Sequence, residues 1–312
     1  LVNGPYTNRL KAPLFSEDSG FYKESFNLNL SAEEDNVTIY YTLDGSNPTQ
    51  QSRKYNKPIS INHKEKGATI VRARAFKQGY PKSKIVTKSY FVNRDILESF
   101  NTLVVSLVTD TDNLFDYERG IFIKGKAFDQ WKKSNPYSSI EITTPTNYNG
   151  RGKKWERQAS LEVFKSDGTL DLSQNIGIRV SGYSSRANKN KSLALYPSRD
   201  YDERKYLFYD FFEGNTRKLF DKDNPPKYTK LLLRTSATDF RYSFIRDMFI
   251  QRLVQGSALL DTMDSKVCIL YINGEYYGLR NFREVYDKNY FNYYYDIDEM
   301  DVVIIKNPSG YP

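Results

Sequence analysis

Short alternating strands separated by turn residues are the feature that most restricts how residues 13–92 can fold. Apolar side chains alternate with polar ones around Phe26, Ile39 and Ile70, and the Asp44-Gly45 dipeptide marks a tight turn after one of these runs. No stretch of helical spacing interrupts the series. Regular short strands of this kind predict a small antiparallel β-sandwich.

A strand, a small polar loop and a second strand are predicted over Gly177–Leu195. The loop contains Gly182, Ser184 and Ser185, and the stretch has no Asp or Glu but four cations: Arg179, Arg186, Lys189 and Lys191. A hairpin loop with free N–H groups and nearby cations suits a phosphate-bearing ligand. The same residues also fit a solvated basic hairpin, so the stretch alone leaves both interpretations open.

Length and charge set broad limits on function. The 312 residues are enough for about two domains. The net charge of +8 favours an anionic partner such as a nucleotide, an acidic protein or a wall polymer. Basic and acidic residues are interleaved along the chain, which argues against a nucleic-acid-binding protein. No apolar run approaches the length of a membrane span.

The chain has one cysteine, Cys268, and one histidine, His63. An internal disulfide framework and a cysteine metal site are therefore excluded. Catalysis by a Ser-His or Cys-His pair would require His63 in the site, yet His63 lies in a polar turn. Cys268 lies in an apolar strand, where a buried thiol acts as a small core side chain.

Residues 102–150 are predicted to contain a buried strand, an acidic turn and a long loop. Thr102–Val108 is a continuous apolar run, as in a strand buried on both faces. Asp110–Asn113 is rich in side-chain oxygens, which fit either a Ca²⁺ or Mg²⁺ site or turn and helix-cap residues. Gly120–Gly125 is predicted as a short strand, and residues 126–150 as an irregular loop.

Helical spacing appears in the last quarter of the chain. Apolar residues recur at helical intervals from Phe244 to Leu253, with Asp239 as the predicted N-cap and Gly256 as the end. Asp247 falls on this helix. Such a spacing predicts an amphipathic helix.

The remaining predictions concern connections and the end of the chain. Asn93–Phe100 is predicted to be a linker, and Asn273-Gly274 is the strongest hairpin signal. A Tyr-rich helix is predicted from Glu284 to about Tyr295, followed by a strand over residues 302–306.

Three stretches of the first part of the chain carry a family resemblance: Ile39–Thr49, Val71–Phe76 and Gly79-Tyr80. Through them this part resembles the chitobiase/β-hexosaminidase C-terminal type domain. It implies an immunoglobulin-like sandwich found in secreted bacterial proteins, usually as a non-catalytic spacer. Three tyrosines of this part either stack on sugars or pack in the core and its turns: Tyr40, Tyr41 and Tyr55.

The second part of the chain contains five sequence blocks in a recognisable order: Val105–Asp116, Arg151–Arg157, Gly182–Leu193, Leu231–Arg234 and Leu270–Leu279. Through these blocks it resembles the CotH kinase family, named for a bacterial spore-coat protein. The family resembles distant protein kinases and is described as transferring phosphate from ATP to protein Ser or Thr outside the cytoplasm. The resemblance implies ATP and Mg²⁺ as cofactors and a protein acceptor as partner.

The resemblance also suggests cofactor-binding residues: Ser184, Ser185, Arg186, Lys191 and Glu284. Lys191 would be the ATP-phosphate lysine, with an exposed strand-end lysine as the alternative. Arg186 would bridge phosphates or form a surface ion pair, and Glu284 would hold the lysine or a metal, or cap the following helix. On the same basis Asp247 would pair with the lysine or lie on a solvated helix face.

Two departures from the family pattern limit this expectation. Ser181 stands where the family often has an arginine before the small residues. The acids that orient the acceptor hydroxyl and bind Mg²⁺ in kinase chemistry are expected in the family's C-terminal half. We therefore assign no catalytic residue and no metal ligand in this chain, and expect its kinase-like domain to be a front portion that is truncated at the C-terminus.

The expected architecture is α+β, with an immunoglobulin-like antiparallel β-sandwich at residues 1–94 and an atypical-kinase-like α+β domain at residues 95–312. The expected function is the nucleotide-site half of a secreted or cell-surface CotH-like bacterial protein kinase. The alternative is a non-catalytic structural or binding module of a spore coat, cell wall or extracellular multi-enzyme assembly, with polysaccharide contact through the sandwich. Neither interpretation includes nucleic acid or a membrane span.

Overall fold

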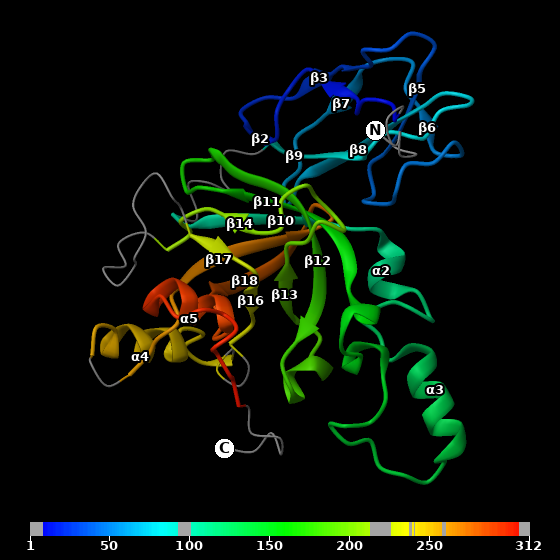
Figure 1. The fold of residues 1–312 in the computed structure, drawn as a ribbon. Coiled ribbons are helices and arrows are strands. Elements are labelled where there is room, and N and C mark those ends of the chain that lie inside the picture. The colour runs from blue at the N-terminus through cyan, green and yellow to red at the C-terminus, as the bar shows by residue number, and fades with distance from the viewer. Residues whose placement is uncertain are drawn as a thin grey trace. The chain divides into compact units, whose positions relative to one another are not determined.

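A computed structural model describes residues 9–92, 101–212, 226–236, 239, 241–257 and 260–305 (Figure 1). The predicted linker at residues 93–100 lies outside this set. Two compact units make up the chain. Unit 1 comprises Leu1–Asp112, Ser160–Ser173 and Leu270–Tyr277, and unit 2 comprises the remaining residues.

The predicted β-sandwich is present in unit 1. A five-stranded sheet has the order β2-β9-β8-β5-β6, and β3 pairs with β7 and β1 with β4 (Figure 1). These pairs are antiparallel as predicted, except that β2 pairs with β9 in parallel. The bounds are β1 (Leu14–Phe15), β2 (Gly20–Tyr22), β3 (Phe26–Leu28), β4 (Leu30–Ser31), β5 (Thr38–Thr42), β6 (Arg53–Lys54), β7 (Ile59–Ile61), β8 (Thr69–Phe76) and β9 (Val86–Val92). The alternating residues that predicted these strands form the core, including Leu28, Ile39, Ile61 and Val71.

The sandwich tyrosines belong to this packing. Tyr41 and Tyr55 lie against the sandwich core, as one of the two interpretations predicted. Tyr40 meets Phe76 edge to face, with ring centroids 5.4 Å apart.

Seven further strands are hydrogen-bonded in a closed barrel, in the order β10-β11-β12-β13-β16-β18-β17. Their bounds are β10 (Leu103–Val108), β11 (Arg157–Phe164), β12 (Leu170–Ser181), β13 (Ser192–Tyr196), β16 (Leu231–Arg234), β17 (Ser265–Ile272) and β18 (Glu275–Arg283). All six residues of β10 are buried, as predicted for a strand covered on both faces. A short pair, β14 (Leu207–Phe208) and β15 (Lys227–Tyr228), is separate.

Within unit 1 the sandwich and the neighbouring barrel strands share one packed core. Phe91 of β9 meets Phe164 of β11 and Tyr271 of β17, with ring centroids 5.7 and 5.0 Å apart. The Asn273-Gly274 turn reaches the sandwich as well, because Ala68 N donates to Gly274 O at 2.8 Å. Unit 1 therefore joins residues of both predicted domains in one body.

The helices are short. They are α2 (Thr111–Phe115), α3 (Gly125–Ser134), α4 (Arg246–Val254) and α5 (Lys288–Tyr295), with 3-10 turns η1 (Asn147–Asn149), η2 (Lys153–Trp155) and η3 (Ser184–Ala187). Asp110 caps the acidic turn, since its Oδ1 accepts from Asp112 N at 3.1 Å. This contact favours the helix-cap interpretation of Asp110–Asn113.

Three local predictions were wrong. Residues 120–124 form turns and irregular structure rather than a strand, and nearly all of α3 falls in the segment 126–150 that was predicted as a loop. The polar composition of that segment hid the helical spacing of Phe128 and Trp131, whose rings lie 6.0 Å apart. Residues 302–305 form no strand.

The fold class is confirmed as mixed α+β with a β-rich N-terminal region and few helices. Among the residues that the structure describes, no helix has both the length and the apolar character needed to cross a membrane.

Candidate functional site

The predicted strand–loop–strand over Gly177–Leu195 is confirmed. Ile178 lies opposite Leu195 and Val180 opposite Leu193, so the two strands pair in the register that their apolar faces require. Gly182 begins the connection at a φ of 111°, and a Cβ there would lie 2.2 Å from Ser185 Oγ. Ser184 and Ser185 open the η3 turn, where Ser184 is exposed and Ser185 half-buried.

Arg186 is turned inward. Its guanidinium donates to the carbonyl oxygens of Gly182, Tyr148 and Gly150 at 2.7, 2.9 and 3.2 Å. Burial lowers the pKa of Arg186 to about 10. The side chain therefore ties η3 to the segment around η1 and is not a surface ion pair.

Lys191 is also buried and bonds its own loop. Its Nζ donates to Arg186 O at 2.6 Å and to Asn188 O at 3.2 Å, and lies 4.3 Å from the ring centroid of Tyr148. Burial, with the nearby charge of Arg186, lowers the pKa of Lys191 to about 8. Direct phosphate contact by Arg186 and Lys191 stays a prediction, and their observed contacts hold the loop in shape.

A cavity of about 430 Å³ lies beside this loop. The loop contributes Asn188, Lys189 and Asn190, the stretch after β16 contributes Thr235, Arg241 and Phe244, and β18 contributes Gly278, Leu279 and Arg280. Three lining residues carry positive charge and none of the described lining residues is acidic. Sequence reasoning missed Arg241 and Arg280, because single cations outside a motif carry no signal.

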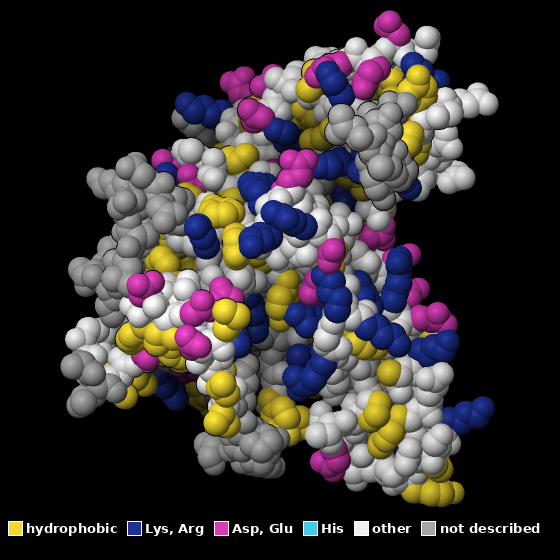
Figure 2. Space-filling model, viewed as in Figure 1, with side chains coloured by type: hydrophobic (Ala, Val, Ile, Leu, Met, Phe, Trp, Pro, Cys, Tyr) yellow, Lys and Arg dark blue, Asp and Glu magenta, His cyan; other side chains and the backbone are white. Residues whose placement is uncertain are grey.

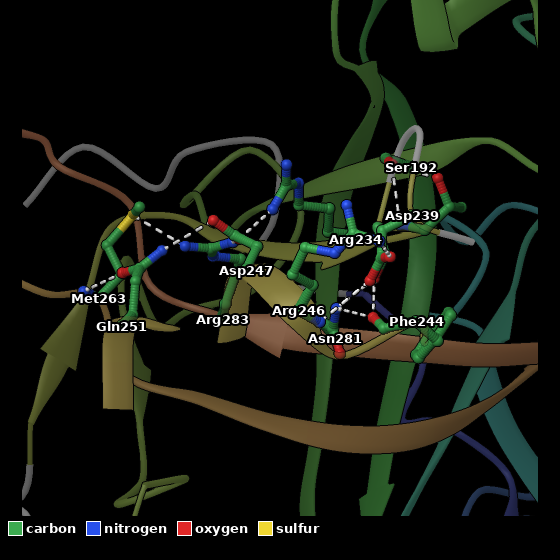
Figure 3. A network of polar contacts seen from close by, with 12 residues as sticks. Ser192, Arg234, Asp239, Phe244, Arg246, Asp247, Gln251, Met263, Asn281 and Arg283 are labelled. Carbon is green, nitrogen blue, oxygen red and sulfur yellow. Dashed lines mark hydrogen bonds and ion pairs between the residues drawn. The ribbon is translucent and has the colours of Figure 1, made fainter. Parts of the chain in front are cut away.

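One wall of the cavity is formed by the connection between β16 and α4, and this connection has an unusual backbone. Ser236 and Phe244 both have positive φ, 61° and 62°, a conformation that side chains with a Cβ rarely adopt. Figure 3 shows how buried Asn281 holds the wall, since its Nδ2 donates to Ser236 Oγ and to Phe244 O. Strained residues at a cavity indicate a functional site when the surrounding bonds fix them, as here.

Asp239 completes this support. Its Oδ2 accepts from Arg246 N at 3.0 Å and from Ser243 Oγ at 2.8 Å, and Arg246 forms an ion pair with its Oδ1 at 3.2 Å. The predicted capping role is thus observed in a different form. Asp239 binds the first N–H of α4 from seven residues away, while Ile245 occupies the N-cap position.

Asp247 on α4 accepts from Arg234 of β16 and from Arg283 of β18 (Figure 3). Arg283 is buried, with 3% of its side chain exposed. Although partial burial opposes the shift, Arg283 and Arg234 hold the pKa of Asp247 below its ordinary value. The acid on this helix therefore pairs with two strand arginines, and neither a solvated face nor a lysine pair describes it.

Glu284 has different neighbours. Its carboxylate accepts from Asp264 N at 2.9 Å and from Tyr294 Oη at 2.8 Å. Asp287 caps α5, because its Oδ1 accepts from Tyr290 N. The structure thus brings Ser184, Ser185, Arg186 and Lys191 together at η3, whereas Glu284 bonds to Asp264 and Tyr294 in a different, buried cluster. A metal role for Glu284 stays a prediction.

Comparisons with known protein families agree with this geometry. Residues 28–90 match the family model described as Fn3 associated, and residues 178–308 match the family model described as CotH kinase protein. The second match includes η3, the cavity residues and the Asp247 network. A comparison with curated proteins gives no match. The chain therefore carries a CotH kinase family domain at residues 178–308, preceded by an Fn3-associated domain at residues 28–90.

Proposed function

We propose that the CotH kinase domain binds the phosphates of a nucleotide such as ATP in the 430 Å³ cavity and uses it for phosphoryl transfer to protein hydroxyls outside the cytoplasm. The observation that carries the proposal is the lining itself. Lys189, Arg241 and Arg280 bring three positive charges to the lining of one cavity. Charge-assisted bonds from such groups are the strong ones in phosphate recognition.

The cavity lining contributes hydrogen-bond donors as well as charge. Asn188, Asn190 and Thr235 add amide and hydroxyl groups to the lining. Arg186 and Lys191 stabilise the loop on its buried side, since Lys191 Nζ donates to the carbonyl oxygen of Asn188. Their own positive charges add to the positive potential of the same region. Figure 2 shows further Lys and Arg side chains gathered over β12 and β13.

The two cofactors implied by the family fit the described residues unequally. The cationic cavity fits the triphosphate of ATP. Among the described residues, no group of three or more His, Cys, Asp or Glu side chains is placed to hold a metal ion. The proposal therefore assigns no Mg²⁺ ligand and no catalytic acid in this chain.

Calorimetric titration of the whole chain with ATP tests the proposal. Arg241→Ala and Lys189→Ala remove exposed cations from the lining, and each is expected to weaken ATP binding at least about tenfold, because a bond to a charged group contributes roughly 1.5–3 kcal/mol. Inorganic triphosphate is expected to show the same losses, since the cavity recognises phosphate.

Lys133→Ala is the matched control, because Lys133 is an exposed lysine in α3 and does not line the cavity. It should bind ATP like the unchanged protein. Absence of ATP binding, or equal binding by the Arg241→Ala and Lys133→Ala proteins, contradicts the proposal. That outcome favours a non-catalytic module of a coat, wall or extracellular assembly.

A further inference from the structure

Helix α4 packs with its polar side toward the protein. Asp247, Gln251 and Gln255 are spaced four residues apart and so lie on one face. Besides the bonds of Asp247 to Arg234 and Arg283, Gln251 Oε1 accepts from Met263 N at 2.8 Å. Gln255 Nε2 donates to Asp264 Oδ1 at 2.7 Å. Hydrogen bonds and ion pairs therefore attach this helix to the neighbouring elements.

The apolar side of α4 faces outward. Ile245, Phe249, Ile250 and Leu253 form what we name the α4 face, and between 41% and 67% of each residue is exposed. No residue of α4 is buried. The α4 face also carries exposed Arg246 and Arg252. A grouped apolar surface with a polar rim is typical of a protein interface, whereas single exposed apolar residues are common everywhere.

A second exposed apolar surface of the same unit has the opposite charge. Residues 295–305, which we name the acidic segment, expose Met300, Val303 and Ile305 at 84%, 81% and 90%. Four exposed acids accompany them: Asp296, Asp298, Glu299 and Asp301. Figure 2 shows hydrophobic side chains over α4, and Asp and Glu side chains over α5 and the segment after it.

We propose that the α4 face of one chain packs against the acidic segment of a second copy, and the reverse, in a two-fold symmetric dimer. The two surfaces match in hydrophobicity and in charge. Each exposes apolar side chains, and the α4 face carries arginines whereas the acidic segment carries Asp and Glu. In a two-fold dimer the same pair of contacts forms twice, so two modest surfaces add to one interface. The charges select the partner and the apolar groups supply most of the affinity.

Sedimentation velocity of the whole chain over a range of concentrations tests the dimer. We expect a monomer–dimer equilibrium that weakens as salt is added, because the rim charges are exposed. Leu253→Asp is expected to raise the dissociation constant at least about tenfold. Ile140→Asp is the matched control, since Ile140 is also an exposed apolar residue of unit 2 and lies outside both surfaces, and it should leave the dimer intact.

Exchanging a positive and a negative charge between the two surfaces tests the dimer without changing its apolar contacts. Arg252→Glu and Asp298→Lys should each weaken the dimer, and the protein with both changes should recover it. Circular dichroism shows whether each variant is folded. A wild-type monomer at every concentration, a dimer that survives Leu253→Asp, or equal loss with Ile140→Asp overturns the proposal. The outcome is separate from ATP binding, because neither surface lines the cavity.

Discussion

Replacing Glu162 by Gln is expected to remove a decline in the free energy of unfolding that the wild-type protein shows between about pH 4.5 and pH 7. Glu162 lies on β11 with 1% of its surface exposed. Its Oε1 accepts from Ser19 Oγ, and its Oε2 is buried without a hydrogen-bond partner among the described residues. A buried carboxylate with an unbonded oxygen is costly to ionise, so the proton is retained.

The neighbours of Glu162 explain the size of the effect. Burial raises the pKa of Glu162 to about 7 from its ordinary value of 4.5, while the bond from Ser19, the polar groups of nearby Ser89 and the charge of Lys88 oppose the rise. Between these two pH values the folded protein holds a proton that the unfolded chain has released. Stability therefore falls as the pH rises through this window, by about 3 kcal/mol in total at roughly 1.4 kcal/mol per unit of pKa.

Chemical unfolding at pH 5 and pH 8 measures the change. The Glu162→Gln protein has no charge to bury, so its unfolding free energy should exceed that of the wild type at pH 8 and lose this advantage at pH 5. Glu24→Gln, at an exposed glutamate of the same unit, should keep the wild-type profile. If Glu162→Gln also keeps it, the carboxyl is ionised in the folded protein and the argument fails.

Periodicity predicted most of the strands, because the alternation of apolar and polar residues lies within each strand. The alternation at Ile39 and Tyr41 or at Ile178 and Val180 is local. Ile39, Ile178 and Val180 are buried as the pattern requires, and Tyr41 packs partly buried against the sandwich core. The orientation of α4 was not predictable in this way. Helical spacing identifies an apolar face but does not say which face the fold covers, and here three polar side chains bond the neighbouring elements.

The candidate site depended on contacts between distant residues. Asp247 bonds arginines that lie 13 and 36 residues away, and the sequence does not reveal strand order or register. Lys191 and Arg186 were identified from their place after a small-residue loop, but their bonds to carbonyl oxygens follow from the turn geometry of η3. Arg280 lies at the cavity because β18 belongs to the barrel, and Arg241 lies there because of the strained connection that contains Phe244.

Gly274→Ala is expected to cost the protein several kcal/mol of stability, far more than Gly79→Ala. Both glycines have positive φ, 81° and 79°, so alanine introduces similar backbone strain of about 1 kcal/mol at each. The surroundings differ. A Cβ at Gly274 would lie 2.4 Å from the backbone oxygen of Ala68, whereas no described atom lies within 4 Å of a Cβ at Gly79.

The clash at Gly274 cannot be relieved by a side chain turning away, because the obstructing atom belongs to the backbone. The turn must move, and it would lose the bond from Ala68 N to Gly274 O together with the bond from Thr109 N to Asn273 Oδ1. Two lost bonds and the strain suggest a total of about 3 kcal/mol. Urea unfolding of the two variants measures the difference. Equal losses would show that the turn is free to move, and that contact with residues 67–68 does not stabilise unit 1.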